Sequence, residues 1–464
     1  MKTILTFVLT ILSVGVSYAN EEAQQLIDQS VRLQQQKYDQ QQRDERASKP
    51  ITGLDVLVDM PSVSFGKERC YPITTIAMVN VDGHPLELRW FKYTRFASTF
   101  ENSCFDLQSI NELITAITAK FIEDGWITVR LGLPEQDLSS GILSIVTIVG
   151  VRGDVITEGV EPGLWKLPLP TLRNQPINLR EIEQAVDQIQ RLQSKKAHVE
   201  VVPGQQIGVS DLAVDISKGK NVVQGSLSQD NHGIDATGVN QISASLVVDN
   251  PFGLADQWIW NVLQSGDKPS FATNQSMSLS VPFGFSTLTA RAGNSESERL
   301  VVGAYESFIL RSKSDSWSAS LSRVLYRDAD SKFIVDIERG RRASHSYIDD
   351  TEIHVQFRDQ AHQKVTVTWQ QRTDNGRWEV GFSTTTGRPD LGGQDDAPDL
   401  RANEGTRRFN VDRYTLSRTA EYKTARQKTF TVENNFNLQQ SSHVLLGTEM
   451  ASIGSAYTVR GFDG

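Results

Sequence analysis

Hydrophobic and polar residues alternate along most of the second half of the chain. From about residue 221 onward, apolar side chains occupy every second position, with serine, threonine, glutamine and arginine between them. Clear examples lie at residues 241–248, 277–281, 317–321, 365–369 and 414–416. A period of two is typical of strands with one apolar and one polar face. The second half therefore predicts a large β structure.

The number of alternating segments favours a membrane barrel. We count roughly ten to twelve segments of ~10 residues, and a water-filled lumen would require their polar face. A soluble secreted β-protein is the alternative with the same alternation. After the first twenty residues no apolar run reaches the ~18 residues that a spanning helix needs, which excludes a helical membrane protein.

Residues 70–150 have the pattern of a compact α/β unit. Ser109 and Glu112 form a capping box that predicts the start of a helix, and Gly125 is placed to end it. One face of this predicted helix carries Ile110, Leu113, Ile114, Ile117 and Phe121. Strands are predicted at residues 73–81, 127–131 and 142–149.

The same order recurs between residues 151 and 218. Asn178 caps a second predicted helix, with Glu181 three residues further on. The buried face of this helix consists of Ile182, Ala185, Val186 and Ile189. Alternation at residues 199–201 and 212–216 predicts two strands after it. The two units share a strand–helix–strand–strand plan and form an internal repeat.

The N-terminus has the features of an exported protein. Residues 1–19 resemble a secretory signal peptide, with Lys2 before an apolar run and small residues at the cleavage site. Residues 20–67 combine a helix that is polar almost all round with an extended linker. Such a helix suits a solvated linker or a water-filled cavity, and disorder is the alternative.

Composition narrows the chemistry of the chain. Its 464 residues fit two to four structural units, and a net charge of -9 argues against a nucleic-acid partner. The only cysteines, Cys70 and Cys104, suggest one disulfide in an oxidising compartment. Zinc-site spacings are missing, and no histidine lies in a recognisable catalytic spacing, so we expect no metal, no cofactor and no enzyme.

Several short segments resemble a known family, the haemolysin-activator transporters of two-partner secretion. Segments that resemble its first polypeptide-transport-associated (POTRA) domain lie at residues 104–105, 121–130 and 134–141, and those that resemble the second lie at 177–184, 203–204 and 208–212. Residues 249–254 resemble the first tight turn of its barrel. Val459, Arg460, Gly461 and Phe462 resemble the signature of its sixth extracellular loop. The pieces occur in the family's order.

This resemblance implies the fold class and the domains. It implies a mixed fold, in which two α/β POTRA domains (residues 68–149 and 150–219) precede an antiparallel transmembrane β-barrel (220–464). The polar helix within residues 20–67 is then a candidate pore plug. The location implied is the outer membrane of a Gram-negative cell, with lipid around the barrel and the N-terminal domains in the periplasm.

The resemblance also implies a function, the export of a large secreted passenger protein. POTRA domains bind unfolded substrate as an additional strand at a sheet edge, with little dependence on sequence. The candidate docking edge in the first domain consists of Trp126, Ile127, Thr128, Val129 and Arg130. Ordinary core packing is the alternative for each apolar residue among them. The passenger is an adhesin, a haemolysin or a contact-dependent toxin.

Arg460 is the residue to which the resemblance gives a specific role. In the family this loop arginine pairs with an acidic residue on the inner barrel wall, and a planar guanidinium suits bidentate binding of a carboxylate. A solvated loop arginine is the alternative. The family's barrel has about sixteen strands, and the last of them follow this loop. Because Gly464 comes two residues after the signature, we expect the sequence to be a fragment of a longer exporter.

Two other functions share parts of this pattern. A protein insertase of the same superfamily usually carries more docking domains and lacks the glutamine-rich N-terminal helix. A passive porin would explain the barrel but not the two units ahead of it. Export therefore accounts for more of the sequence than either alternative.

Overall fold

The computed structural model of the chain describes residues 70–450 apart from 158, 232, 234–235, 303–305 and 424–428. The signal peptide, the polar N-terminal helix and the loop signature at 459–462 lie outside the described residues. Among those described, no helix combines the length and apolar character needed to cross a bilayer.

The first α/β unit contains two small sheets and two helices. Strands β1 (Tyr71–Ile73) and β3 (Ser103–Phe105) pair with each other, and β2 (Thr75–Val79), β5 (Ile142–Ile148) and β4 (Arg130–Gly132) form a sheet in the order β2-β5-β4. Helices α2 (Phe91–Ser98) and α3 (Leu107–Glu123) complete the unit. The predicted apolar face of α3 is confirmed, because Leu113, Ile117 and Phe121 are fully buried.

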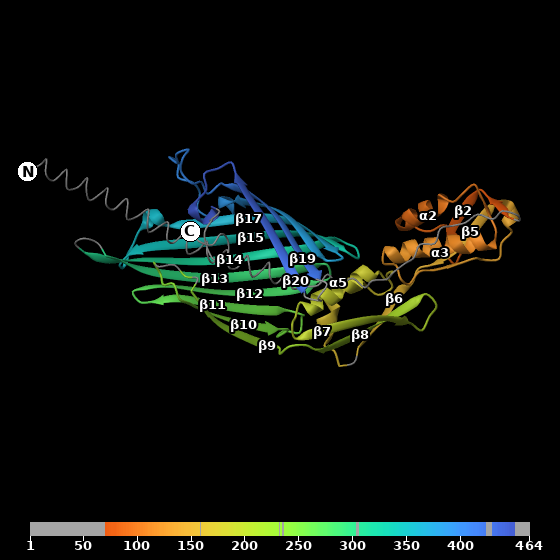
Figure 1. The fold of residues 1–464 in the computed structure, drawn as a ribbon, viewed down its shortest axis with the longest axis horizontal. Helices are drawn as coiled ribbons and strands as arrows, with labels where there is room; N and C mark the ends of the chain where they lie inside the picture. The colour runs from red at the N-terminus through yellow and green to blue at the C-terminus, as the bar shows by residue number, and fades with distance from the viewer. Residues whose placement is uncertain are drawn as a thin grey trace, which may run out of the picture.

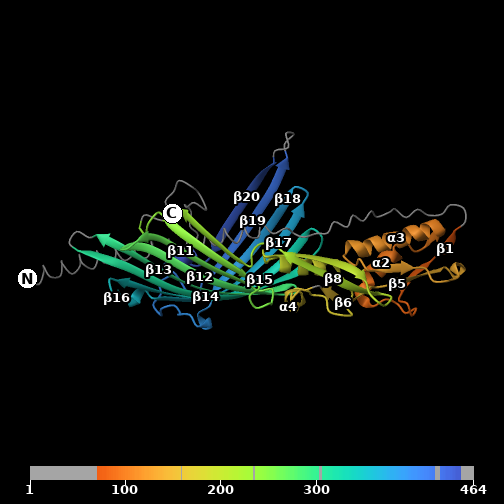
Figure 2. The ribbon, with the colours of Figure 1, turned by 90° about the horizontal axis from the view of Figure 1, so that it is seen from below.

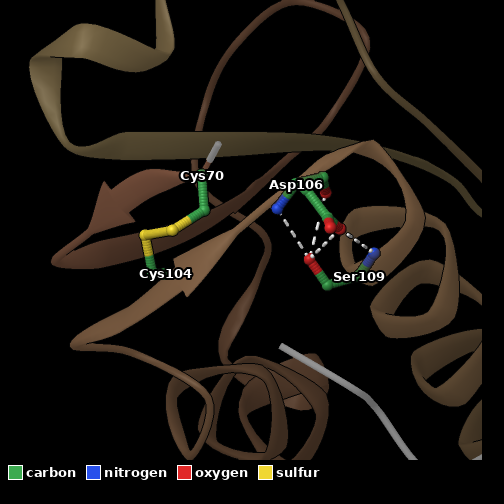
Figure 3. The surroundings of a disulfide bond; sticks show 4 residues. All are labelled: Cys70, Cys104, Asp106 and Ser109. Atoms are coloured by element: carbon green, nitrogen blue, oxygen red, sulfur yellow. Dashed lines mark hydrogen bonds between the residues drawn. A yellow bond between two sulfur atoms is a disulfide. The ribbon is translucent and has the colours of Figure 1, made fainter. Parts of the chain in front are cut away.

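The predicted start of α3 was one turn too late. Asp106 is the N-cap residue, and its side chain accepts a hydrogen bond of 2.8 Å from the Ser109 backbone N–H. The Ser109 hydroxyl in turn accepts the Asp106 N–H at 2.8 Å, as Figure 3 shows. The capping box therefore joins Asp106 to Ser109 and not Ser109 to Glu112. The helix ends as predicted, with Gly125 at a φ of 90° directly after it.

The second α/β unit repeats the plan of the first. Its elements are β6 (Val151–Thr157), α4 (Pro162–Lys166), α5 (Leu179–Gln190), β7 (Lys195–Pro203) and β8 (Val209–Lys218). The sheet order β6-β8-β7 has the same parallel and antiparallel pairings as β2-β5-β4. Asn178 caps α5 as predicted, with its side chain accepting the Arg180 N–H at 2.8 Å. The internal repeat is confirmed, with a second helix in each unit.

A single antiparallel sheet of 12 strands follows. Its strands are β9 (Val223–Asp230), β10 (Gln241–Asp249), β11 (Gln257–Asp267), β12 (Ser270–Phe283), β13 (Ser286–Val302), β14 (Ser307–Arg327), β15 (Ser331–Ile348), β16 (Thr351–Glu352), β17 (Arg358–Thr373), β18 (Gly376–Gly387), β19 (Asn410–Lys423) and β20 (Thr429–Ser441). Neighbours in the chain are neighbours in the sheet, except that the short β16 pairs only with β15. Figures 1 and 2 show the sheet curving, with both α/β units beyond one end of its strands.

The two faces of this sheet differ as the alternation predicted. On β14, Trp317 and Leu321 are about half exposed, and the serines between them lie on the less exposed face. Cross-strand register continues the apolar face, since Leu321 lies opposite Leu288 on one side and Ile337 on the other. One face is therefore apolar and outward, and the other is polar and sheltered.

Candidate functional site

The predicted docking segment, residues 126–130, begins as a turn and not as a strand. The prediction of a strand from residue 127 was wrong, because β4 starts only at Arg130. The Trp126 ring packs edge-on against the ring of Trp90, with 4.9 Å between centroids. Val129 is 1% exposed and belongs to the core of the first unit. Trp126 and Val129 thus shape the core.

Thr128 lies where the two units join. Its hydroxyl donates a hydrogen bond of 3.2 Å to the Gly150 carbonyl oxygen, and a Cβ at position 150 would come within 2.5 Å of the Thr128 Cβ. The neighbouring Ile127 is partly buried. Arg130 is exposed and is the first residue of the edge strand β4. Of the five predicted residues, only Arg130 lies on a strand edge.

Each unit presents an edge strand in equivalent positions of the repeat. In the first unit this is β4, which has three residues and pairs with β5. In the second unit it is β7, which has nine residues and pairs with β8 along its whole length. Among the described strands neither has a partner on its other side. The longer edge therefore belongs to the second unit.

A disulfide holds the beginning of the first unit. Cys70 and Cys104 are joined with 5.3 Å between their Cα atoms, and Figure 3 shows the bond close to the N-cap of α3. Hydrogen bonds from the Ser109 backbone and hydroxyl lower the pKa of the Asp106 carboxyl at this cap. The start of the unit and the start of its main helix are thus fixed together.

The two α/β units meet end to end. The Asn178 side-chain amide donates to the Asp124 carbonyl oxygen at 3.1 Å, and the Leu179 N–H donates to the Gly125 carbonyl oxygen at 2.8 Å. The Asp124 carboxylate also accepts the Tyr93 hydroxyl at 2.8 Å. Burial and this neighbouring carboxylate raise the pKa of Tyr93. The end of α3 therefore abuts the start of α5.

Helix α5 also contacts three successive turns at the nearby end of the sheet, here called the rim turns (residues 250–256, 284–285 and 328–330). At the third rim turn, Arg327 reaches α5 with a side chain that is 1% exposed. It donates to Glu183 at 3.2 Å, Gln184 at 3.1 Å and Asp187 at 2.5 Å. Lys332, also 2.5 Å from Asp187, completes this contact.

The second rim turn binds the next polar residue of α5. The Gln188 amide donates to the Gly284 carbonyl oxygen at 3.3 Å and to the Thr287 hydroxyl at 3.0 Å. Gln188 is nearly fully buried although its side chain is polar. Its donors are satisfied by the sheet and not by water.

The first rim turn surrounds Arg191, which follows the last residue of α5. Its guanidinium donates to the Ala255 carbonyl oxygen at 2.6 Å and to the Ser280 hydroxyl. Asp249 and Asp256 are fully buried and lie close enough to oppose the effect of burial, which lowers the pKa of Arg191 to about 10. One buried cation therefore lies near two buried carboxylates.

The sequence analysis did not predict this junction between α5 and the end of the sheet. The polar stripe of α5 consists of Arg180, Glu183, Gln184, Asp187 and Gln188, together with Arg191 directly after the helix. Their spacing of three or four residues predicts a helix face directed to solvent just as well as one directed to a partner. Helix α5 contains no lysine, and this was the signal in the sequence that its polar face does not lie in solvent.

The sheltered face of the sheet carries a run of small hydroxyl side chains. On β14 they are Ser312, Ser314, Ser316, Ser318, Ser320 and Ser322. Register places Ser276 of β12 and Ser245 of β10 in the same row as Ser316. Charged pairs such as Arg291–Glu338, 3.5 Å apart, lie beside this surface. A hydroxyl-rich surface of this kind is suited to contact with water or extended polar chain.

Three family models match the chain in succession. A ShlB-type POTRA domain matches residues 74–150, a further POTRA domain matches 148–203, and the haemolysin secretion/activation protein ShlB/FhaC/HecB matches 208–464. The first two ranges correspond to the two α/β units without β8, and the third covers β8 and the long sheet.

Curated relatives and a solved structure agree with this order. The outer membrane transporter CdiB-2 of Burkholderia pseudomallei (strain 1026b) is 30% identical over 456 residues, which cover 93% of this chain and 76% of the relative. The outer membrane transporter CdiB of Dickeya dadantii (strain 3937) is 28% identical, covering 80% of this chain and 65% of the relative. The structure of CdiB from Escherichia coli aligns with a TM-score of 0.81 at 25% identity, covering 95% of this chain and 80% of that one.

Proposed function

This chain belongs to the family of haemolysin secretion/activation proteins ShlB/FhaC/HecB, and on that premise we propose that it exports a partner protein across the outer membrane. The partner is a large passenger that arrives unfolded in the periplasm, binds the two POTRA domains and leaves through a β-barrel. We assign residues 68–149 and 150–219 to the POTRA domains and 220–464 to the barrel. The observation that carries the proposal is the polar, serine-rich face of the sheet behind two docking domains.

Docking at strand edges is the proposed mode of binding. An extended chain that pairs with an edge strand gains main-chain hydrogen bonds whatever its side chains, so one transporter can bind many segments of its passenger. Strand β7 offers nine residues for such pairing and β4 offers three. We therefore propose β7 as the main docking edge and the Arg130 end of β4 as a second contact.

Reconstitution in liposomes tests the proposed export. The chain is inserted into vesicles of outer-membrane lipid, an unfolded passenger from the neighbouring gene is added, and protection from protease is measured. An exporter moves this one passenger and few others. General acceleration of barrel folding would favour the insertase, and passage of small solutes without any polypeptide would favour the porin.

Photo-crosslinking tests the docking edges. A photoreactive residue at His198 on β7 or at Arg130 on β4 should crosslink to the passenger, since both side chains are exposed beside an edge. The control is the same residue at Arg89, which is exposed in a short helix of the first unit and lies on no strand. Equal crosslinking at all three positions would contradict docking at edges.

A further inference from the structure

Helix α5 buries both its apolar face and its polar face. This is unusual for a helix with so many polar residues. Its apolar face packs on the sheet of the second unit, and its polar stripe is buried as well, with Glu183 at 2% exposure and Gln184 at 4%. Burying polar groups is costly unless each finds a partner. The rim turns and the strand ends beside them supply such partners, so the stripe has a use that folding of the unit alone does not explain.

The contacts run from Glu183 to the residue that follows the helix, Arg191. Arg327 and Lys332 bind its middle, Gly284 and Thr287 bind Gln188, and the first rim turn binds Arg191. Contacts at three separate turns oppose rotation as well as sliding. A single contact would leave the unit free to pivot.

The same junction reaches the docking edge. The Ser194 N–H, one residue before β7, donates to the buried Asp249 carboxylate at 2.9 Å. The other Asp249 oxygen accepts the Gln257 side-chain amide at 3.0 Å. The residue before the edge strand is therefore attached to the last residue of β10, which directly precedes the first rim turn.

We propose that the polar stripe of α5 and the rim turns form an orientation lock that holds the second unit, and with it the β7 edge, in one position relative to the sheltered face of the sheet. Arg327 is the central positioning residue of this lock. In the export function proposed above, on which this inference rests, the lock delivers a bound passenger to a constant place at the rim.

Arg327 is suited to this role by its geometry. A guanidinium donates in several directions within one plane, and Arg327 uses this to bind three side chains on two successive turns of α5. Lysine has a single ammonium and cannot reproduce the fork. The variant Arg327→Lys should therefore keep the charge and loosen the lock.

Distance measurements between spin labels test the lock. One label is attached at His198 on β7 and one at Asp374, which is exposed between β17 and β18 at the same end of the sheet. In the unsubstituted chain we expect one narrow distance distribution. Arg327→Gln should broaden it at least twofold, Arg327→Lys should give an intermediate width, and export of the passenger should fall at least tenfold in Arg327→Gln.

The matched control is Arg173→Gln, which removes an exposed pair with Asp154 on the same unit and should leave the width unchanged. Heat-modifiable migration on a gel verifies that the sheet of each variant is folded, and Asp187→Asn replaces Arg327→Gln if the latter does not fold. A distribution as narrow in the variants as in the parent overturns the lock, even if export falls. If the parent exports nothing while the variants still broaden the distribution, the export function fails and the lock stands.

Discussion

At the residue scale, Arg191 is a buried cation near the buried carboxylates of Asp249 and Asp256. Asp249 receives hydrogen bonds from Ser194 and Gln257, and Asp256 receives one of 3.0 Å from the Trp258 indole N–H. These neutral donors bind the carboxylate oxygens but leave the two negative charges uncompensated. Only a cation can balance them, and a pKa of about 10 leaves Arg191 charged at neutral pH.

Replacing Arg191 by Met should therefore destabilise the chain strongly. Removing this buried cation leaves the nearby carboxylates uncompensated, and for a buried ion pair a loss of this kind costs about 3–5 kcal/mol. Urea titration of the purified chain in detergent measures the free energy of unfolding. The control Arg173→Met breaks a pair that is more than half exposed and should cost below about 1 kcal/mol. Equal losses in the two variants would contradict the assignment.

Glu181 makes the second unit sensitive to pH. Burial raises the pKa of its carboxyl, and a hydrogen bond from the Thr171 hydroxyl only partly offsets this. A carboxyl whose pKa is higher in the folded state stabilises the fold while it is protonated. That contribution is present below the pKa of the unfolded chain and is lost as the pH rises through the folded pKa.

Glu181→Gln should accordingly raise the thermal unfolding temperature of the second unit at about pH 8 and change it little at about pH 4, where glutamate is largely protonated. Glutamine accepts the same hydrogen bond from Thr171 and cannot ionise. Scanning calorimetry at both pH values measures the difference. Glu200→Gln, on the exposed side of β7, serves as control, and an unfolding temperature below that of the parent at pH 8 would refute the expectation.

At the element scale, sequence periodicity identified the helices themselves. It was less informative about the residues at which they begin and about the elements that they contact. The apolar face of α5 was predictable because Ile182, Ala185 and Ile189 recur at helical spacing. Its polar stripe was not interpretable, since burial of Glu183 and Gln184 depends on rim turns more than 100 residues away in the chain. Tertiary contacts, and not the local sequence pattern, decide whether such a polar face lies in solvent or packs against another element.

The start of α3 illustrates a local ambiguity. Two capping patterns overlap there, Asp106 with Ser109 and Ser109 with Glu112. Both place a short polar residue three positions before a second polar group, and the sequence does not choose between them. The extended backbone at Asp106 and its two hydrogen bonds with Ser109 decide the outcome.

The docking segment illustrates a different failure. Ile127, Val129 and Leu131 alternate and so predict a strand, but Gly125 reverses the chain and Trp126 turns inward onto Trp90. Thr128 is then held at the joint with the second unit by Gly150. Three residues of apparent alternation were therefore too few to define a strand.

At the scale of the whole molecule, polar contacts connect the first unit to the second unit and the second unit to the sheet. The end of α3 meets the start of α5 through Gly125 and Asn178, and α5 meets the sheet through its polar stripe. The long sheet itself was predictable, since alternation over many strands is a repeated signal. The attachments were not, because each joins residues of distant elements through a few polar atoms.

The apolar outer face of the sheet leads to a prediction about the membrane. Leu321 lies between Trp317 and Leu325 on β14, flanked across the sheet by Leu288 and Ile337. A lysine on the lipid face near the middle of a barrel costs about 2–4 kcal/mol, and the cost falls toward the interfaces. Leu321→Lys should therefore make folding into lipid vesicles less favourable by about this amount.

The adjacent residue provides the control. Ser320 lies on the sheltered, hydroxyl-rich face, so Ser320→Lys places the same charge one residue away in a polar environment and should change the folding free energy far less. Urea titration of vesicle folding, followed by heat-modifiable migration, compares the two variants. Because the pair differs only in which face carries the lysine, equal tolerance of both substitutions would mean that lipid does not cover the apolar face, and the membrane-embedded sheet would have to be abandoned.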